Sequence, residues 1–321
     1  MRRRSLLAGG LALPALGARA DTWPTRPIRM LVAYAPGATG DILARLYGEQ
    51  LSKLLGQNIV VDNKTGAGGT IAMAELARAP ADGYTLGVIA QGLLVYNLGL
   101  YKNPSYDPFK DLTILSINIS VCNVLILHPS NPAKTVADVV EQVRAKNGAF
   151  TFSSGGIGTS HHMSGVLLEM RTGVKMTHVP YRATTAGIQA VMNGEVDMGL
   201  FNMPTVVSLI RSGKLKAIAV TSERRSEQFP ELPTMMEAGI KDYVVDTWLG
   251  FGGPAGLPPP LVTRLNTELN RIADDPQMHK KLVDQGISVL PSVTPEQALK
   301  YLRQDTDFWL PIIKASGATA E

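Results

Sequence analysis

Three glycine-rich segments carry residue types suited to binding an anion through the main chain. They are residues 36–41 (PGATGD), 65–72 (TGAGGTIA) and 153–162 (SSGGIGTSHH), and in each the small residues lead into a helical pattern. Glycine permits unusual backbone angles and close approach of a ligand, while free N–H groups at a helix start attract negative charge. One such loop is more often an ordinary turn. Three of them favour a small anionic ligand held mostly by backbone groups.

Ser160 is followed by His161 and His162, which suggests a nucleophile beside a base. Consecutive helical residues point about 100° apart and do not face each other, so a catalytic pair would need distant partners that the sequence does not identify. The three loops also lack the GxSxG elbow, the GxGxxG spacing and the P-loop lysine. No HExxH motif or partnered carboxylate accompanies His161, His162 or His178. We therefore expect no catalytic residue, no metal and no cofactor.

The start of the chain has the pattern of a cleavable export signal. A basic region at 2–4 precedes an apolar stretch at 6–16 and a small-x-small pattern at 18–20. Residues 3–7 (RRSLL) fit a twin-arginine signal, and a general secretory signal fits as well. We expect cleavage after Ala20 and export to the periplasm. No later stretch approaches the roughly 18 unbroken apolar residues of a membrane helix.

Charge and cysteine content narrow the classes of partner. The formal net charge is +4, and four of the arginines lie in the expected signal, so the mature chain is close to neutral. Nucleic-acid binding therefore lacks its electrostatic driving force. Cys122 is the only cysteine, which excludes an intramolecular disulfide. The remaining chain of about 300 residues is long enough for two domains, and we expect a monomer.

Apolar β-type runs alternate with helical patterns in two series. The first series has strands at 28–34, 58–62 and 85–90 with helices at 41–55 and 69–79, which indicates a parallel sheet covered on both faces. The second series has strands at 121–128, 150–153, 175–179, 198–202 and 217–221, with helices at 135–146, 160–172, 184–193 and 204–212. A strand at 247–253 and helices at 261–273, 276–285 and 295–315 complete the chain.

These patterns predict an α/β fold of two lobes, each an open sheet flanked by helices. We assign residues 21–124 and 246–321 to lobe 1 and residues 125–245 to lobe 2, because a continuous second lobe would be oversized. The chain then crosses between lobes near 122–126 and 244–249, where we expect a hinge. Ligands of such sheets bind at the loops after the strands, so the crevice between the lobes is the expected site.

Several ordered blocks with matching spacing resemble the periplasmic solute receptors of tripartite tricarboxylate transporters, also called the Bordetella uptake gene family. The blocks cover essentially the whole mature chain, at 23–45, 60–87, 153–165, 179–201, 215–239 and 248–266. The resemblance implies a two-lobed Venus-flytrap receptor of the type II periplasmic-binding-protein fold. Such a receptor closes on a carboxylated metabolite and presents it to a membrane permease. A hydrolase or lyase acting on a small carboxylate remains the alternative.

In the receptors that this chain resembles, ligand contacts come largely from the first strand-to-helix loop, the Gly/Ser loop of the second lobe and ordered water. The ligand-binding residues expected here are Tyr34, Gly37, Ala38, Thr39, Gly40, Asp41, Gln91, Ser154, Gly156, Gly158, Thr159, His162, Tyr181, Thr184 and Asn202. We expect Asp41 to cap its helix, because a carboxylate would repel an anionic ligand. Whether Asp41 and His162 touch the ligand or only order the loops stays open.

Four positions depart from the pattern usual in those receptors. Ala33 and Ala38 stand where relatives tend to have proline and glycine, and Ala183 stands where glycine is frequent. The methyl groups of Ala38 and Ala183 would narrow the pocket. Ala190 replaces a common aspartate, which disfavours a ligand with an amino group if that position faces the cleft.

Overall fold

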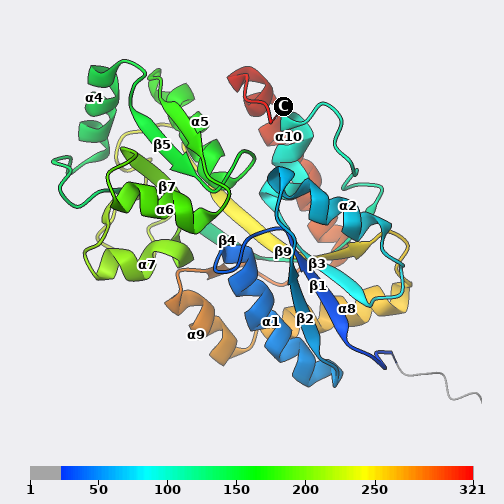
Figure 1. The fold of residues 1–321 in the computed structure, drawn as a ribbon. Helices are drawn as coiled ribbons and strands as arrows, with labels where there is room; N and C mark the ends of the chain where they lie inside the picture. The colour runs from blue at the N-terminus through cyan, green and yellow to red at the C-terminus, as the bar shows by residue number, and fades with distance from the viewer. Residues whose placement is uncertain (1–22, 321) are drawn as a thin grey trace, which may run out of the picture.

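The computed structural model describes residues 23–320, so the expected export signal lies outside the described residues. Its strands form one long path in the order β2-β1-β3-β9-β4-β7-β5-β6. Two long neighbouring strands, β4 (Leu112–Leu127) and β9 (Asp246–Pro254), run through the middle of the molecule. Figure 1 shows the green elements on one side of these strands and the blue, cyan, orange and red elements mostly on the other.

The first half-sheet contains β1, β2, β3, β9 and residues 112–122 of β4. Strand β1 (Ile28–Val32) pairs in parallel with β2 (Ile59–Asn63) and β3 (Thr85–Ala90). Helices α1 (Thr39–Leu55) and α2 (Thr70–Arg78) connect them, which confirms the βαβαβ prediction. Strand β9 pairs antiparallel with β3 and with β4.

The second half-sheet contains β5, β6, β7, β8 and the end of β4. Strand β5 (Thr151–Ser154) pairs in parallel with β6 (Thr177–Pro180) and β7 (Met198–Asn202). Residues 123–127 of β4 pair antiparallel with β7, and β8 (Lys216–Val220) pairs with the same part of β4. The helices of this half are α4 (Val136–Lys146), α5 (Ser160–Thr172), α6 (Thr184–Met192) and α7 (Met203–Arg211).

The C-terminal elements pack mainly on the first half-sheet. They are α8 (Pro259–Ala273), α9 (Pro276–Asp284), the short strand β10 (Ser288–Val289) and α10 (Pro295–Ser316). Helix α8 contacts α1 and β4, β10 pairs with β4, and α10 contacts β4 and the segment after β3. No helix between residues 23 and 320 is long and apolar enough to cross a membrane.

Most predicted elements agree with the structure to within two residues at each end, but the start of β4 and the segment after β3 differ, and β10 and the turn η1 were not predicted. Strand β4 begins at Leu112 rather than near 121, because β9 and β10 pair with residues that sequence patterning alone left unassigned. After β3, a π-helical turn η2 (Gly92–Tyr96) and a short helix α3 (Asn97–Leu100) pack under α10. A short apolar run fits strand and helix equally well, so packing decides its conformation. A further turn, η1 (Ala67–Gly69), precedes α2.

The close contact between β4 and β9 depends on Gly250. The pairing register shifts between Ile114 and Ser116, and again between Ile117 and Ile119, so β4 is irregular at this point. A Cβ atom on Gly250 would lie 1.9 Å from the backbone oxygen of Ser116. Only glycine therefore allows the two backbones to approach so closely.

We expect Gly250→Ala to lower the free energy of unfolding by at least about 2 kcal/mol, since the clash is with backbone that cannot rotate away. Urea denaturation followed by circular dichroism measures the loss. Gly48→Ala is the matched control, because its Cβ would meet only the Ile59 side chain, at 3.4 and 3.5 Å. That helical substitution should leave stability unchanged or raise it by up to about 1 kcal/mol. Equal stability of the two variants would contradict the packing argument.

Candidate functional site

An enclosed cavity of about 30 Å³ lies between the two half-sheets, at the carboxyl ends of several strands. Its volume holds one or two water-sized molecules. Its wall combines loop and helix-start residues of both halves with two residues of β9. The wall consists of Tyr34, Ala38, Thr39, Gly40, Ala90, Gly92, Thr159, Ser160, His161, Thr184, Asn202, Thr247 and Leu249.

A wider groove of about 560 Å³ adjoins the cavity, and Tyr34, Thr159 and Thr184 belong to both walls. The rest of its wall is Ala33, Ala35, residues 65–69, Tyr101, residues 155–158, residues 180–183 and Ala320. All three glycine-rich segments therefore meet at this site, as the sequence predicts. A larger hollow of about 810 Å³ lies between α1 and α8. It contains none of these loops, so we place no ligand there.

Four helix starts converge on the enclosed cavity. Thr39 begins α1, Ser160 begins α5, Thr184 begins α6, and Asn202 caps α7. The first backbone N–H groups of α1 and α5, at residues 39–40 and 160–161, have no acceptor among the described residues. The positive ends of these helices therefore point at one small volume whose wall holds no acidic side chain.

The side chain of His161 is fully engaged by hydrogen bonds in the cavity wall. Gly155 N–H donates to Nδ1 at 3.2 Å, so the ring proton is on Nε2, which donates to Asn202 Oδ1 at 3.1 Å. Burial lowers the pKa of His161 to about 4, so the ring is neutral at pH 7. With both ring nitrogens occupied, His161 is not available as a base or a metal ligand.

Asn202 connects the two half-sheets across the cavity. Its Oδ1 also accepts from the Thr39 hydroxyl at 3.3 Å, which brings the start of α1 against the start of α7. Its Nδ2 donates to Asn123 Oδ1 at 2.6 Å and to Ser160 Oγ at 3.3 Å. Thr39, Ser160 and Asn202 therefore hold one another in place around the cavity.

His162 lies behind the cavity wall and stacks on His178, with ring centroids 4.1 Å apart. His178 Nε2 is 2.7 Å from Ser154 Oγ, which accepts from Gly156 N–H at 3.0 Å. Burial lowers the pKa of His162 to about 4 and that of His178 to about 3. These residues order the loop at 155–158 from behind.

Asp41 is likewise outside both walls and serves as an internal anchor of the first loop. It accepts from Gly37 N–H at 2.9 Å, from Arg45 at 2.9 and 3.0 Å, and from Asn63 at 3.0 Å. Burial raises the pKa of the Asp41 carboxyl, but these hydrogen bonds lower it by a larger amount. The pKa of Asp41 is therefore below its ordinary value. The expectation that Asp41 orders the loop fits this geometry.

Ten of the fifteen predicted contact residues line the cavity or the groove: Tyr34, Ala38, Thr39, Gly40, Gly156, Gly158, Thr159, Tyr181, Thr184 and Asn202. The other five, Gly37, Asp41, Gln91, Ser154 and His162, lie outside both walls. Gln91 points away from the cavity, since its Nε2 is hydrogen-bonded to Asp305 at 2.9 and 3.0 Å.

The structure adds wall residues that the sequence prediction missed, above all His161, Thr247 and Arg182. Arg182 is the one charged side chain in either wall, and it has no hydrogen-bond or ion-pair partner among the described residues. Arg182 directly follows the predicted contact residue Tyr181, so the sequence could have indicated it as a wall residue. No motif near Thr247 in the sequence indicates that Thr247 lines the cavity. Ala38 and Ala183 line the site as expected. Ala190 is buried in the core of the second half and lies in neither wall.

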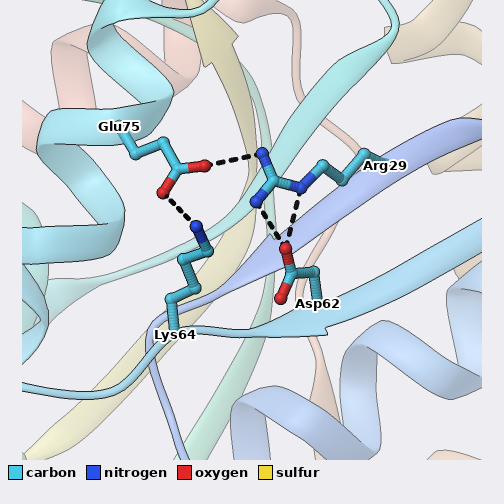
Figure 2. Close-up of polar contacts among 4 residues, drawn as sticks. All are labelled: Arg29, Asp62, Lys64 and Glu75. Atoms are coloured by element: carbon cyan, nitrogen blue, oxygen red, sulfur yellow. Dashed lines mark hydrogen bonds and ion pairs between the residues drawn. The ribbon is translucent and has the colours of Figure 1, made fainter.

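Figure 2 shows the ion-pair cluster that anchors the loop at 65–69. Arg29 on β1 binds both Asp62 on β2 and Glu75 on α2, and Lys64 binds Glu75 at 2.7 Å. The hydrogen bond from Lys64 holds the pKa of Glu75 below its usual value. The four charges cancel, so the cluster positions the loop without attracting a ligand. Between residues 23 and 320, no group of three or more metal-ligating side chains is found.

Comparison with known proteins gives a consistent result over most of the chain. The profile of the tripartite tricarboxylate transporter family receptor matches residues 43–318. The R. palustris protein Rpa4515, solved with adipate, is 31% identical with a TM-score of 0.89, covering 92% of this chain and 99% of that one. The periplasmic binding protein BugD is 32% identical with a TM-score of 0.87 over 92% and 99% of the two chains.

A third solved relative is MatC from Rhodopseudomonas palustris, which has malate bound. It is 29% identical with a TM-score of 0.84, covering 91% of this chain and all of that one. These similarities confirm the predicted α/β periplasmic-binding-protein fold.

The buried histidines predict how stability depends on pH. The unfolded chain takes up protons on these rings below pH 6.5, whereas His161 and His162 stay neutral in the fold down to about pH 4. The free energy of unfolding should therefore fall between pH 7 and pH 5, by on the order of 1–2 kcal/mol for each of these two rings. Urea titrations at both pH values measure the loss. His162→Phe keeps a ring on His178 and should reduce the loss, whereas exposed His279→Gln should not.

Proposed function

Because the chain belongs to the tripartite tricarboxylate transporter receptor family, we propose that it binds a small carboxylate between its two half-sheets and delivers it to a membrane permease. The family is one of transporter receptors, and its solved members include a periplasmic binding protein. It is not a family of enzymes, which sets the hydrolase or lyase alternative aside. The proposal includes export by the signal at residues 1–20 and action as a monomer in the periplasm.

The observation that carries the proposal is the convergence of four helix starts on a cavity wall without acidic side chains. Backbone N–H groups bind a carboxylate there without a charged side chain. Relatives solved with adipate and malate indicate the class of compound. The same geometry leaves the wall without a free base, since both nitrogens of His161 are occupied.

We further propose that the two half-sheets and their helices form two lobes that open to admit the ligand. The cavity of about 30 Å³ holds only water-sized molecules, and a Cβ on Gly92 would lie 2.5 Å from the Gly158 oxygen, so the halves touch. Residues 21–124 and 246–321 would form lobe 1, and residues 125–245 lobe 2. Bending near 122–126 of β4 and 244–249 at the start of β9 would separate them.

Gly158 tests carboxylate binding in the closed form. Its φ is +81°, and a Cβ would lie 2.7 Å from Asn97 Oδ1 of the other half, so Gly158→Val should block closure. Adipate or malate at about a hundred times its dissociation constant should stabilise the wild-type protein by about 2.7 kcal/mol. Thermal unfolding should show this shift in the wild type and no shift in Gly158→Val.

Gly173→Val is the matched control for that variant. Gly173 ends α5 with a φ of +69° and no neighbouring atom within 4 Å, so valine there causes backbone strain without an obstacle between the halves. Gly173→Val should lower the free energy of unfolding but keep the full ligand-induced shift in thermal unfolding. A shift that survives in Gly158→Val, or conversion of either acid detected by mass spectrometry, would argue against the proposed receptor.

Small-angle X-ray scattering tests the hinge. The wild-type protein saturated with adipate or malate should have a smaller radius of gyration than Gly158→Val under the same conditions, because only the wild type closes fully. The same radius for both proteins would exclude closure about β4 and β9 as we describe it.

A further inference from the structure

Three hydroxyls in the wall of the enclosed cavity, those of Tyr34, Thr184 and Thr247, have no hydrogen-bond partner among the described residues, and only the Thr247 hydroxyl is completely buried. Thr247, on β9, is 7% exposed, and its Oγ1 has neither donor nor acceptor among the described residues. Neighbouring polar side chains of the same wall, those of Thr39, Ser160 and Asn202, all bond within the protein. Thr247 therefore differs from these three residues because its buried hydroxyl has no partner within the described part of the chain.

A buried hydroxyl without a partner destabilises a fold, so such groups in natural proteins usually have a role. Thr247 pairs with Val121 of β4 in the antiparallel ladder, and it lies on the same face of β9 as Leu249, which also lines the cavity. No tight packing requirement explains a hydroxyl there, because valine has the same shape. The same wall includes the starts of α1 and α5 with their free N–H groups.

We propose that Thr247 is a direct ligand contact, with its hydroxyl donating a hydrogen bond to the carboxylate at the inner end of the ligand. This inference rests on the proposed function and adds a specificity-determining side chain to it. The free N–H groups at residues 39–40 and 160–161 bind the same carboxylate from the two halves. Thr247 adds a donor from the start of β9, within the proposed hinge segment. A ligand with an apolar inner end is rejected because it leaves this hydroxyl unsatisfied.

Two variants at this position separate the hydroxyl from the shape of the side chain. Thr247→Val removes only the hydroxyl and should weaken binding of adipate or malate about 10- to 100-fold, as measured by isothermal titration calorimetry. The melting temperature of the ligand-free protein should rise by about 1–3 °C, because an unsatisfied group is gone. Thr247→Ser keeps the hydroxyl and should bind within about threefold of wild type.

Thr306→Val is the matched control, because Thr306 is 6% exposed but its hydroxyl donates to Leu302 O at 2.7 Å, far along the chain in α10. It should leave affinity unchanged and should not raise the melting temperature. If Thr247→Val binds as tightly as wild type, or Thr247→Ser weakens binding as much as Thr247→Val, the assignment of Thr247 is wrong. If the wild-type protein binds neither acid, the proposed function itself fails, and the role of Thr247 fails with it.

Discussion

The pairing of β4 with β9 is the constraint on which the rest of the structure depends. Residues 112–122 of strand β4 belong to the first half-sheet and residues 123–127 belong to the second. One continuous strand therefore fixes how the two halves face each other. Gly250 lets β9 approach closely enough to complete the ladder. Because both halves are ordered around this pair, the carboxyl ends of their parallel strands meet at one small cavity.

What that volume presents to a ligand is mostly main chain. Helices α1, α5, α6 and α7 all begin there, and their dipoles add a positive potential that needs no charged side chain. The polar side chains that share the wall are largely committed to one another, as the bonds of Asn202 to Thr39 and Ser160 illustrate. The result is a rigid set of donors, which suits binding and release of an unchanged anion.

A second set of residues lies outside the cavity wall and holds the three glycine-rich loops in place. Asp41 ties the first loop to Arg45 and Asn63, while the cluster around Glu75 anchors the second loop (Figure 2). His178 reaches the third loop through Ser154. Each of the three glycine-rich loops thus has its own internal support, which compensates for the conformational freedom of its glycines.

The sequence by itself determined most of the strands and helices, the three loops suited to an anion, and the family, because these depend on local periodicity and on motifs contiguous in the chain. It also identified ten residues that line the site, since they sit in those loops. Only the tertiary structure decided that His162 and Gln91 lie outside the walls of the cavity and the groove, and that His161 and Thr247 line the cavity. The reason is that wall membership depends on how β4 and β9 bring distant segments together, and neighbouring residues on a helix or strand point in different directions.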